Sequence, residues 1–393
     1  MTTFRPRLAV IHPWLLASGG SEPVALWAAQ ALRDDFRVRI LTMGKSGLDE
    51  LNAAYGTSLS EPDIEIVRMA VPPFLVRRGD ALRSYWLARY ARARAADCDI
   101  LLSAYNGMDF GRPGIQYISD FSFSDPLRRA LLEDARDWRK KIRPAGAARR
   151  GYLALARVLS GQTKNGWRQN LTVANSAWTR GLLAAAFGVQ ASVVYPPVPS
   201  IDSLLPWEQR TAGFVSIGRI VPEKRIIEMI QILARVRAAS APLAYRVLGR
   251  VSDSPYGRAV AAAAHTAGGW VSLDGPVYGS AKAERLGGCR YGLAGCLHES
   301  FGIAAAEMVR AGMIVWVPAS GGQTEIVDHP DLIYDDDTDA AAKIGRVLRD
   351  PARQSALREH LARQADKFSV ERFRAGIRET VGLFQETHGR PSA

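Results

Sequence analysis

The sequence predicts an α/β protein built from two similar halves, and three observations carry this prediction. Short apolar and β-branched runs alternate with helical patterns along almost the whole chain, which is typical of parallel sheets covered by helices. A proline-rich segment at 195–207 separates two such series, because its prolines can continue neither a helix nor a central strand. The 393 residues, 47% of them hydrophobic, suffice for two domains with separate cores.

The expected elements follow from these patterns in chain order. In the first half we expect helices notably at 22–33 and 81–96, and strands at 8–12, 37–42, 64–68, 100–103, 115–119, 171–174 and 192–195. In the second half we expect strands at 214–217, 245–248, 270–273, 291–297, 314–317 and 332–334. After Glu223, apolar residues recur at helical spacing and predict one buried face: Ile226, Ile230, Leu233 and Val236.

These elements predict the domain organisation. An N-terminal domain is expected at 1–200 and a C-terminal domain at 201–370. Residues 371–393 are expected to form a helix that returns to the N-terminal domain.

Composition limits the classes of function. The three cysteines, Cys98, Cys289 and Cys296, form neither CxxC pairs nor a disulfide framework, which fits a reducing cytoplasm. No apolar run reaches the roughly 18 residues of a membrane span. The chain is therefore expected to be cytoplasmic, or peripheral on the inner face of a membrane.

Positive charge is concentrated in residues 128–168. The chain carries a net charge of +12, and this segment alone has twelve basic residues against three acidic ones. Because aromatic and aliphatic residues lie between the charges, the segment suits an anionic membrane surface. A polyphosphate ligand or a nucleic acid would be attracted by the same field, and a solvated helical face is the plain alternative.

The strongest candidate site is the run HESFGIAAAE at 298–307, directly after a predicted strand. Ligands bind at this edge of a parallel sheet, and Glu299 in the loop and Glu307 about one turn into the next helix can contact two parts of one extended ligand. Three backbone N–H groups at the helix start suit sugar hydroxyls or phosphate oxygens: those of Phe301, Gly302 and Ile303. Alternatively, Glu299 caps the helix and Glu307 is a surface residue.

A second strand-to-helix connection, GRIVPEKR at 218–225, is rich in cations. Gly218 lets the backbone turn close to a ligand, and Pro222 presets the first helical turn. Arg219 and Lys224 add two cations beside a positive helix end, which suits a pyrophosphate and can stabilise charge on a departing diphosphate. Exposed surface cations are the alternative interpretation.

A glycine turn near the N-terminus is the third candidate. Gly19 and Gly20 lie between the first strand and the first helix, within SGGSE at 18–22, and allow a phosphate or sugar to approach the backbone. The sequence has no complete GxGxxG, which counts against a dinucleotide-dependent oxidoreductase.

Taken together, these motifs resemble the retaining GT-B glycosyltransferases of family 4, in order and spacing over essentially the whole chain. The resemblance rests on GGSE at 19–22, GR at 218–219 with Lys224, Glu299-x7-Glu307 and SGGQTEI at 320–326. Further segments look like the Alg11-type mannosyltransferases and their bacterial relatives: HPW at 12–14, VANSAWT at 173–179 and VYPPV at 194–198.

The resemblance implies a fold and a reaction. It implies two Rossmann-like domains that face each other across a cleft. The reaction would be retaining transfer of a hexose, mannose from GDP-mannose, to a hydroxyl of a glycan or lipid-linked glycan. Neither a metal nor another cofactor would be needed.

The resemblance also implies roles for individual residues. Arg219 and Lys224 would bind the donor diphosphate, Glu307 the ribose hydroxyls, and Glu299 the transferred sugar. The backbone at 301–303 would complete the sugar pocket. Gly19 and Gly20 would let the N-terminal domain close over the donor.

One position departs from the family pattern. Family members commonly carry a histidine in a Tyr-x-His context, close to the reacting carbon, where this chain has YISD at 117–120. Ser119 occupies the aligned position and Asp120 follows it. Asp120 could position an acceptor hydroxyl or stabilise positive charge on the sugar, whereas the plain alternative is a turn residue.

Other functions were weighed on the same residues. A UDP-sugar donor is the alternative within the enzyme class, with 274–280 as the place to look for recognition of the base. The missing histidine favours a non-catalytic nucleotide-sugar-binding protein, and the charge alone favours a nucleic-acid binder, which would leave the glutamates and glycine turns without a role. The run Asp335, Asp336 and Asp337 resembles a metal-binding DxD, but turn and helix-cap chemistry explains it better.

Overall fold

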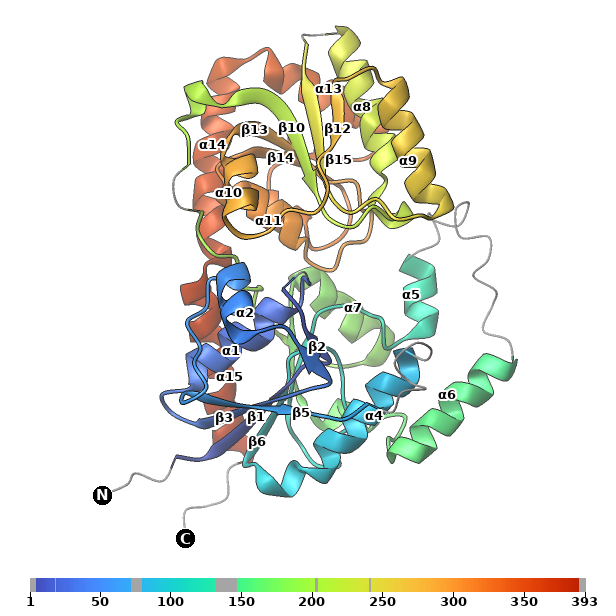
Figure 1. Cartoon of the computed structure of the whole chain (residues 1–393), viewed down its shortest axis with the longest axis vertical. Helices are drawn as coiled ribbons and strands as arrows, with labels where there is room; N and C mark the ends of the chain where they lie inside the picture. Colours follow the sequence, from blue (N-terminus) through green and yellow to red (C-terminus); the bar gives the residue numbers. More distant parts are fainter. Residues whose placement is uncertain are drawn as a thin grey trace. The chain divides into compact units, whose positions relative to one another are not determined.

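The computed structural model describes residues 5–17, 19–71, 80–131, 147–201, 204–239 and 242–388. The chain divides into two compact units (Figure 1). Unit 1 contains Met1–Arg128, Arg143–Pro197 and Val370–Ala393, and unit 2 contains Arg129–Ile142 and Val198–Ser369. The chain thus passes from unit 1 to unit 2 after Pro197 and returns to unit 1 at Val370. The boundaries predicted from the sequence were after residues 200 and 370.

Unit 1 is built on a seven-stranded sheet in which every pairing is parallel, in the order β5-β3-β1-β6-β7-β8-β9. The strands are β1 (Arg7–Ile11), β3 (Arg37–Thr42), β5 (Ile64–Arg68), β6 (Ile100–Ser103), β7 (Ile115–Ile118), β8 (Leu171–Ala174) and β9 (Ser192–Val193). A separate two-stranded ribbon pairs β2 (Trp14–Leu15) with β4 (Gly44–Lys45). The strand order reverses between β1 and β6, and loops at such a switch point form ligand sites.

Helices cover both faces of this sheet. They are α1 (Glu22–Leu32), α2 (Leu48–Tyr55), α4 (Asp80–Ala93), α5 (Asp125–Leu131), α6 (Ala147–Ser160), α7 (Ala177–Phe187) and α15 (Val370–His388), with short 3-10 turns at Ala95–Asp97 and Gly166–Gln169. Alternate residues of β1 enter two cores: Leu8 and Val10 pack on α1 and α15, and Ala9 and Ile11 pack on the α4 side. The C-terminal helix α15 completes the core of unit 1, where it contacts α1.

Unit 2 has a six-stranded parallel sheet in the order β12-β11-β10-β13-β14-β15. Its strands are β10 (Thr211–Ile217), β11 (Ala244–Leu248), β12 (Val271–Leu273), β13 (Cys289–Leu293), β14 (Ile314–Pro318) and β15 (Ile333–Tyr334). Its helices are α8 (Ile226–Ala239), α9 (Pro255–Thr266), α10 (Gly279–Gly287), α11 (Ile303–Arg310), α12 (Thr324–Val327), α13 (Asp337–Leu348) and α14 (Pro351–Ala365), with 3-10 turns at Trp207–Gln209, Pro222–Lys224 and Asp366–Phe368.

The predicted α/β class is confirmed, and the apolar spacing of α8 gives the predicted buried face: Ile226, Ile230, Leu233 and Val236 are all buried. Two strand ends were predicted two or more residues too late. The strand expected at 192–195 ends at Val193. The strand expected to run to residue 297 ends at Leu293, and Gly295 lies in the loop beyond it. At Gly295 a Cβ atom would come within 2.7 Å of the Lys224 carbonyl oxygen, so close approach of two backbones requires glycine there.

Candidate functional site

The main candidate site lies at the carboxyl ends of β10, β13 and β14 in unit 2. Gly218 directly follows β10. Its φ of 137° is a backbone conformation that glycine adopts readily and other residues rarely do, and its N–H donates to the carbonyl of Leu248 at 3.0 Å. The next turn, Pro222–Lys224, brings Lys224 back toward the sheet, and Arg225 closes it in the left-handed conformation with φ 51°. Arg219 is exposed beside this turn. The glycine and the turn therefore deliver two cations to one sheet edge.

Lys224 forms an ion pair with Glu299, whose carboxylate approaches from the loop after β13. About a quarter of each side chain is exposed, 25% for Lys224 and 27% for Glu299. Burial alone would lower the pKa of Lys224, but the Glu299 carboxylate outweighs it and raises that pKa above its usual value. Burial would likewise raise the pKa of Glu299, and Lys224 holds it below its usual value. Both groups are charged at neutral pH.

Backbone contacts from a second loop hold Glu299 in place. The carbonyl of Glu299 accepts a hydrogen bond from the Gly322 N–H at 2.8 Å. Gly321 has φ 88°, and a Cβ atom there would lie 2.5 Å from the same carbonyl oxygen. His298, the preceding residue, bonds through Nδ1 to Ser320 Oγ at 2.8 Å. The SGG turn at 320–322 thus fixes the loop that carries the carboxylate.

Glu307 forms the second ion pair of the site. It lies in α11, and its Oε1 is 2.6 Å from Nζ of Lys282 in α10. Lys282 was not predicted from the sequence. It lies in α10, which ends 16 residues before α11 begins, and no spacing pattern indicates which carboxylate its side chain contacts. Both predicted glutamates are thus paired with a lysine, but Glu307 and Lys282 are not among the residues that line the cavity beside Glu299.

The residues between the two glutamates form the start of α11. Gly302 is the N-terminal cap with φ 104°, and its carbonyl accepts the N–H of Ala306 at 3.0 Å. The ring of Phe301 is buried against Phe368, with ring centroids 5.4 Å apart. Phe301 therefore anchors the loop through its side chain. Ile303 is the first residue of α11, so its backbone N–H lies at the helix start, where the sequence analysis expected N–H groups that can face a ligand.

These residues line a small cavity. Gly218, Arg219, Lys224, Glu299 and Gly302 all contribute to it, and about 30 Å³ is open inside. Cys296, which sequence analysis assigned no role, lies in the same wall, where burial first and the Glu299 carboxylate second raise its pKa to about 12. Its thiol is thus protonated at neutral pH.

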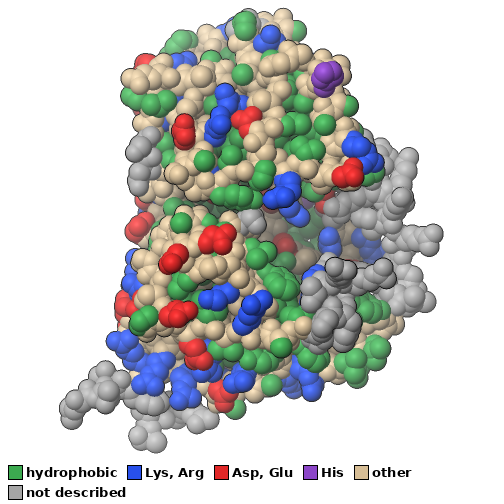
Figure 2. Space-filling model, viewed as in Figure 1, with side chains coloured by type: hydrophobic (Ala, Val, Ile, Leu, Met, Phe, Trp, Pro, Cys, Tyr) green, Lys and Arg blue, Asp and Glu red, His purple; other side chains and the backbone are tan. Residues whose placement is uncertain are grey.

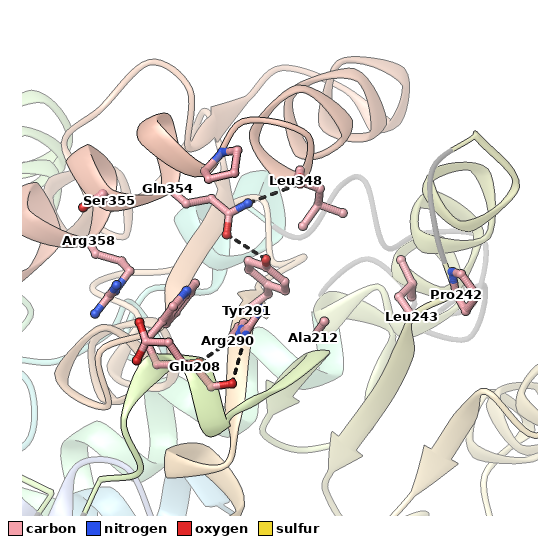
Figure 3. Close-up of a pocket in the computed structure, with 12 residues that line it drawn as sticks. Glu208, Ala212, Pro242, Leu243, Arg290, Tyr291, Leu348, Gln354, Ser355 and Arg358 are labelled. Atoms are coloured by element: carbon pink, nitrogen blue, oxygen red, sulfur yellow. Dashed lines mark hydrogen bonds between the residues drawn. The ribbon is translucent and has the colours of Figure 1, made fainter.

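A larger cavity of about 560 Å³ lies elsewhere in unit 2 (Figure 3). It opens beside Ala212 and Arg290, at the amino ends of β10 and β13, and therefore at the opposite edge of the sheet from Glu299. The indole of Trp207 lies near two guanidinium groups, those of Arg290 and Arg358, and Tyr291 donates to Gln354 at 3.0 Å. None of its lining residues belongs to the predicted motifs.

In unit 1, the glycine turn is packed against a buried acid. A Cβ atom on Gly19 would lie 1.8 Å from the carboxylate of Glu22, and the Gly19 N–H donates to the Tyr55 hydroxyl at 3.0 Å. Gly20 is exposed, and Ser18 lies outside the described residues. Glu22 is buried, which raises its pKa. A side chain at residue 19 would therefore displace the Glu22 carboxylate from its present position.

His12 follows β1 and lies beside this turn. Its Nε2 is 3.0 Å from Ser21 Oγ, its ring contacts Tyr105 at a centroid distance of 5.5 Å, and its Nδ1 is a buried atom without a hydrogen-bond partner among the described residues. Burial lowers the pKa of His12 to about 4, so the ring is neutral at physiological pH. His12 thus lies at the carboxyl end of β1, at the switch point of the unit 1 sheet.

Asp120 follows β7 and accepts three hydrogen bonds. They come from Asn106 Nδ2 at 2.6 Å, the Ser122 N–H at 2.8 Å and the Tyr105 hydroxyl at 3.5 Å. Asn106 has φ 63°, and its Oδ1 accepts the N–H groups of both Ser119 and Asp120. Asp120 is therefore a turn residue, as the plain alternative predicted, and a carboxylate fixed at the same sheet edge as His12. No sequence motif indicates Asn106.

The acidic run after β15 caps a helix. Oδ1 of Asp336 accepts the N–H groups of Thr338 and Asp339 at the start of α13, as predicted, and Asp337 pairs with Arg225 at 3.0 Å. Among the described residues, no group of three His, Cys, Asp or Glu side chains is placed to hold a metal ion.

Part of the basic segment 128–168 lies within the described residues and part, 132–146, lies outside them. Searching the described part of the chain reveals no helix with the length and apolar character to cross a membrane.

Comparisons with known proteins identify the class to which this fold belongs. The model of the family "Glycosyl transferases group 1" matches residues 205–368, which is less than half of the chain and lies within unit 2. Comparison by sequence with curated proteins gave no match.

Solved structures match over nearly the whole chain. HepE of Anabaena, solved with UDP and glucose, is 15% identical with a TM-score of 0.68, over 96% of this chain and 100% of its own. Sucrose-phosphate synthase of Thermosynechococcus elongatus is 14% identical with a TM-score of 0.70, over 98% and 100%. WaaG, a glycosyltransferase of lipopolysaccharide biosynthesis, is 14% identical with a TM-score of 0.68, over 95% and 100%.

The fold is therefore the GT-B fold, with two Rossmann-like domains. Unit 2, which carries the two ion pairs, is the part of the chain that is similar to the group 1 glycosyl transferases.

Proposed function

We propose that the protein is a retaining, metal-independent glycosyltransferase that moves a hexose, mannose from GDP-mannose, to a hydroxyl of a glycan or lipid-linked glycan. The observation that carries this proposal is the Lys224–Glu299 ion pair in the cavity that Arg219 also lines, together with a second lysine–glutamate pair, Lys282–Glu307, whose glutamate lies on the helix that follows the Glu299 loop. A nucleotide sugar has a dianionic diphosphate between two polyhydroxylated rings. Cations flanked by carboxylates match this order of charges and hydroxyls.

Donor binding would redistribute the contacts of this site. Lys224 and Arg219 would meet the diphosphate, because guanidinium and ammonium groups form charge-assisted hydrogen bonds with phosphate oxygens. Glu299 would accept hydrogen bonds from the transferred sugar, and Glu307 from the ribose. The N-terminal backbone of α11, at Gly302 and Ile303, would face the sugar in a region where a helix dipole is positive.

In the proposed reaction the acceptor hydroxyl attacks the anomeric carbon on the face from which the diphosphate departs. The bond from that carbon to the phosphate oxygen breaks, and the departing oxygen takes the acceptor proton. Lys224 and Arg219 lower the barrier by stabilising the charge that develops on the diphosphate, so the work is positioning and neutralisation rather than covalent catalysis. These side chains supply the charge that a metal ion would otherwise supply.

Unit 1 would hold the acceptor. Asp120 is fixed by Asn106 and Tyr105, and its carboxylate suits an acceptor hydroxyl or positive charge on the sugar. We further propose a cytoplasmic protein that works at the inner face of a membrane, where the basic segment 128–168 would meet anionic lipid near a lipid-linked acceptor.

A direct test is incubation of the purified chain with GDP-mannose and with UDP-glucose, followed by mass spectrometry of donor hydrolysis and of transfer to a panel of glycans. The proposal expects turnover of GDP-mannose that the Lys224→Met variant loses. Thermal-shift titrations with GDP, UDP and ADP would rank the bases, since only a ligand that favours the folded state raises the midpoint.

Two other candidates each have an observation in their favour. HepE was solved with UDP-glucose, which favours a UDP-sugar donor; a UDP-induced thermal shift larger than that with GDP would select it. Ser119 stands where family members commonly carry a histidine, which favours a non-catalytic nucleotide-sugar-binding protein. Tight donor binding without hydrolysis or transfer would select that alternative.

A further inference from the structure

Helix α6 of unit 1 presents an apolar face to solvent. Leu155, Val158 and Leu159 are 59%, 75% and 60% exposed, and Gly151 and Ala154 on the same side are exposed as well. At about 100° per residue, these five positions fall within one stripe of the helix. A helix on a soluble domain normally directs its apolar stripe inward, and here Ala156 and Ser160 occupy the buried side.

Cations flank this stripe and no acidic residue interrupts it. From 147 to 168 the sequence holds five basic residues and no Asp or Glu. Arg150 and Arg157 lie beside the stripe on the helix, and Lys164 is exposed just beyond the helix end. Figure 1 shows α6 at the outer side of unit 1 next to α4, and Figure 2 shows apolar side chains at the surface in this region.

The helix is attached firmly to the domain by its C-terminal end. Arg89 and Arg92 of α4 donate through Nη1 to the carbonyls of Leu159 and Gly161, at 3.2 and 2.6 Å. These guanidinium groups satisfy carbonyls that a helix end leaves unpaired. The exposed leucines are therefore held in one orientation relative to the sheet of unit 1.

We infer that this face, Leu155, Val158 and Leu159 with Arg150, Arg157 and Lys164 around them, docks unit 1 on an anionic lipid bilayer. Apolar side chains that enter the acyl boundary while cations remain at the headgroups are the arrangement of an interfacial helix. The inference depends on the proposed function for its purpose, which is to bring the protein to a lipid-linked acceptor. Its evidence, the exposure and charge of α6, is independent of the donor site.

Two other occupants fit less well. A stable dimer buries about 800 Å² on each partner, which three large apolar side chains of one helix do not supply. In a two-fold pair the basic flanks would also face like charges. A nucleic acid would engage the cations but would leave Leu155, Val158 and Leu159 without a partner.

Vesicle cosedimentation tests the inference, with the full chain and no donor present. Phosphatidylcholine vesicles with and without phosphatidylglycerol are compared at low and high salt. The test variant is Leu155→Ser/Leu159→Ser, and the matched control is Leu205→Ser/Leu383→Ser, which removes two leucines of similar exposure outside this face. Circular dichroism melting of each variant shows that it is folded.

We expect the wild-type chain to sediment with anionic vesicles, the test variant to bind them about tenfold or more weakly, and the control to bind as the wild type does. Arg150→Gln/Lys164→Gln should also weaken binding about tenfold, and only to anionic vesicles. No binding of the wild type at low salt, or equal binding by wild type and test variant, would overturn the inference. Loss of a wild-type dimer by the test variant, without any vesicle binding, would overturn it in favour of self-association.

Failure of this inference is distinguishable from failure of the proposed function. Donor hydrolysis is measured without vesicles, and vesicle binding without donor. A chain that turns over GDP-mannose and ignores vesicles contradicts the docking surface and the proposed place at a membrane, and leaves the proposed reaction standing. A chain that docks through α6 and leaves every nucleotide sugar intact contradicts only the proposed reaction.

Discussion

The carboxyl edges of the two parallel sheets carry different kinds of polar interaction. In unit 2 the edge is ionic, with Lys224 paired to Glu299 and Lys282 paired to Glu307. In unit 1 the corresponding edge is a hydrogen-bonded cluster, with a neutral His12, the Tyr105 hydroxyl and the carboxylates of Glu22 and Asp120. Lysine–glutamate ion pairs suit a charged ligand, whereas hydroxyl and amide side chains suit a ligand that carries hydroxyl groups. The contrast is the basis on which the proposed function has the diphosphate bind at unit 2 and a sugar acceptor at unit 1.

The largest effect is expected at Lys224. Lys224→Met removes the cation that would contact the departing diphosphate. It also leaves the largely buried Glu299 carboxylate without its ion-pair partner. We expect kcat to fall by about 10²- to 10³-fold, the range typical for loss of one electrostatic group that acts in the transition state. Steady-state kinetics with GDP-mannose would measure this. Lys282→Met is the matched control, since it breaks the other ion pair and should change donor affinity more than kcat; equal kcat values for both variants would contradict the assignment.

A smaller loss, in affinity rather than turnover, is expected at Glu307. If its carboxylate binds two ribose hydroxyls, Glu307→Ala should weaken donor binding by a few kcal/mol, because hydrogen bonds to charged groups contribute about 1.5 to 3 kcal/mol each. Isothermal titration with the nucleotide diphosphate measures this directly. Glu299→Ala provides the comparison and should mainly reduce turnover. Wild-type activity in both variants would show that the site is elsewhere.

Unit 1 should show an acid-sensitive stability that depends on His12. Because burial lowers the pKa of His12 from 6.5 to about 4, the unfolded chain binds more protons than the folded chain between these values. Stability is therefore full above pH 6.5 and falls toward pH 4, by up to about 3 kcal/mol.

Glu22 acts in the opposite direction, since its raised pKa makes the folded chain bind protons more readily as the pH falls. Chemical unfolding from pH 7 to pH 4 with wild type and His12→Gln would isolate the histidine. A pH dependence that is the same in both proteins would refute its buried, neutral state.

The smallest effect is expected at Asp120. Asp120→Asn keeps a side chain that can accept from Asn106 and the Ser122 N–H, but removes the charge. We expect transfer to the acceptor to fall about tenfold, less than the roughly 10²- to 10⁴-fold that a positioned acid–base group contributes, because the amide keeps these hydrogen bonds. Donor affinity, which unit 2 provides, should not change. A drop in donor affinity with normal transfer would contradict the division of work between the units.

Local patterns predicted most of the fold, because strands and helices are specified by the spacing of neighbouring apolar residues. The buried face of α8 and the cap at Asp336 are examples in which one short segment contains the whole signal. The end of β13 at Leu293 was missed, since Ala294, Cys296 and Leu297 continue the apolar run although they lie in the loop beyond the strand and are only partly buried.

The site was predicted unevenly for a related reason. Arg219, Lys224, Glu299 and Glu307 belong to motifs with recognisable spacing, and the structure brings Lys224 into contact with Glu299. Lys282, Tyr105 and Asn106 lie in segments with no such pattern. The order of strands in each sheet brings Lys282 to Glu307 in unit 2, and Tyr105 and Asn106 to Asp120 in unit 1. Ion pairs and hydrogen bonds between distant segments have no local signature in a single sequence.

The most direct test is the structure of the chain crystallised with GDP or UDP. The account predicts the diphosphate against Lys224 and Arg219, the ribose hydroxyls on Glu307, and Lys224 moved from Glu299 toward a phosphate oxygen. Nucleotide bound instead in the cavity beside Trp207 and Arg358, with both lysine–glutamate contacts unchanged, would contradict it.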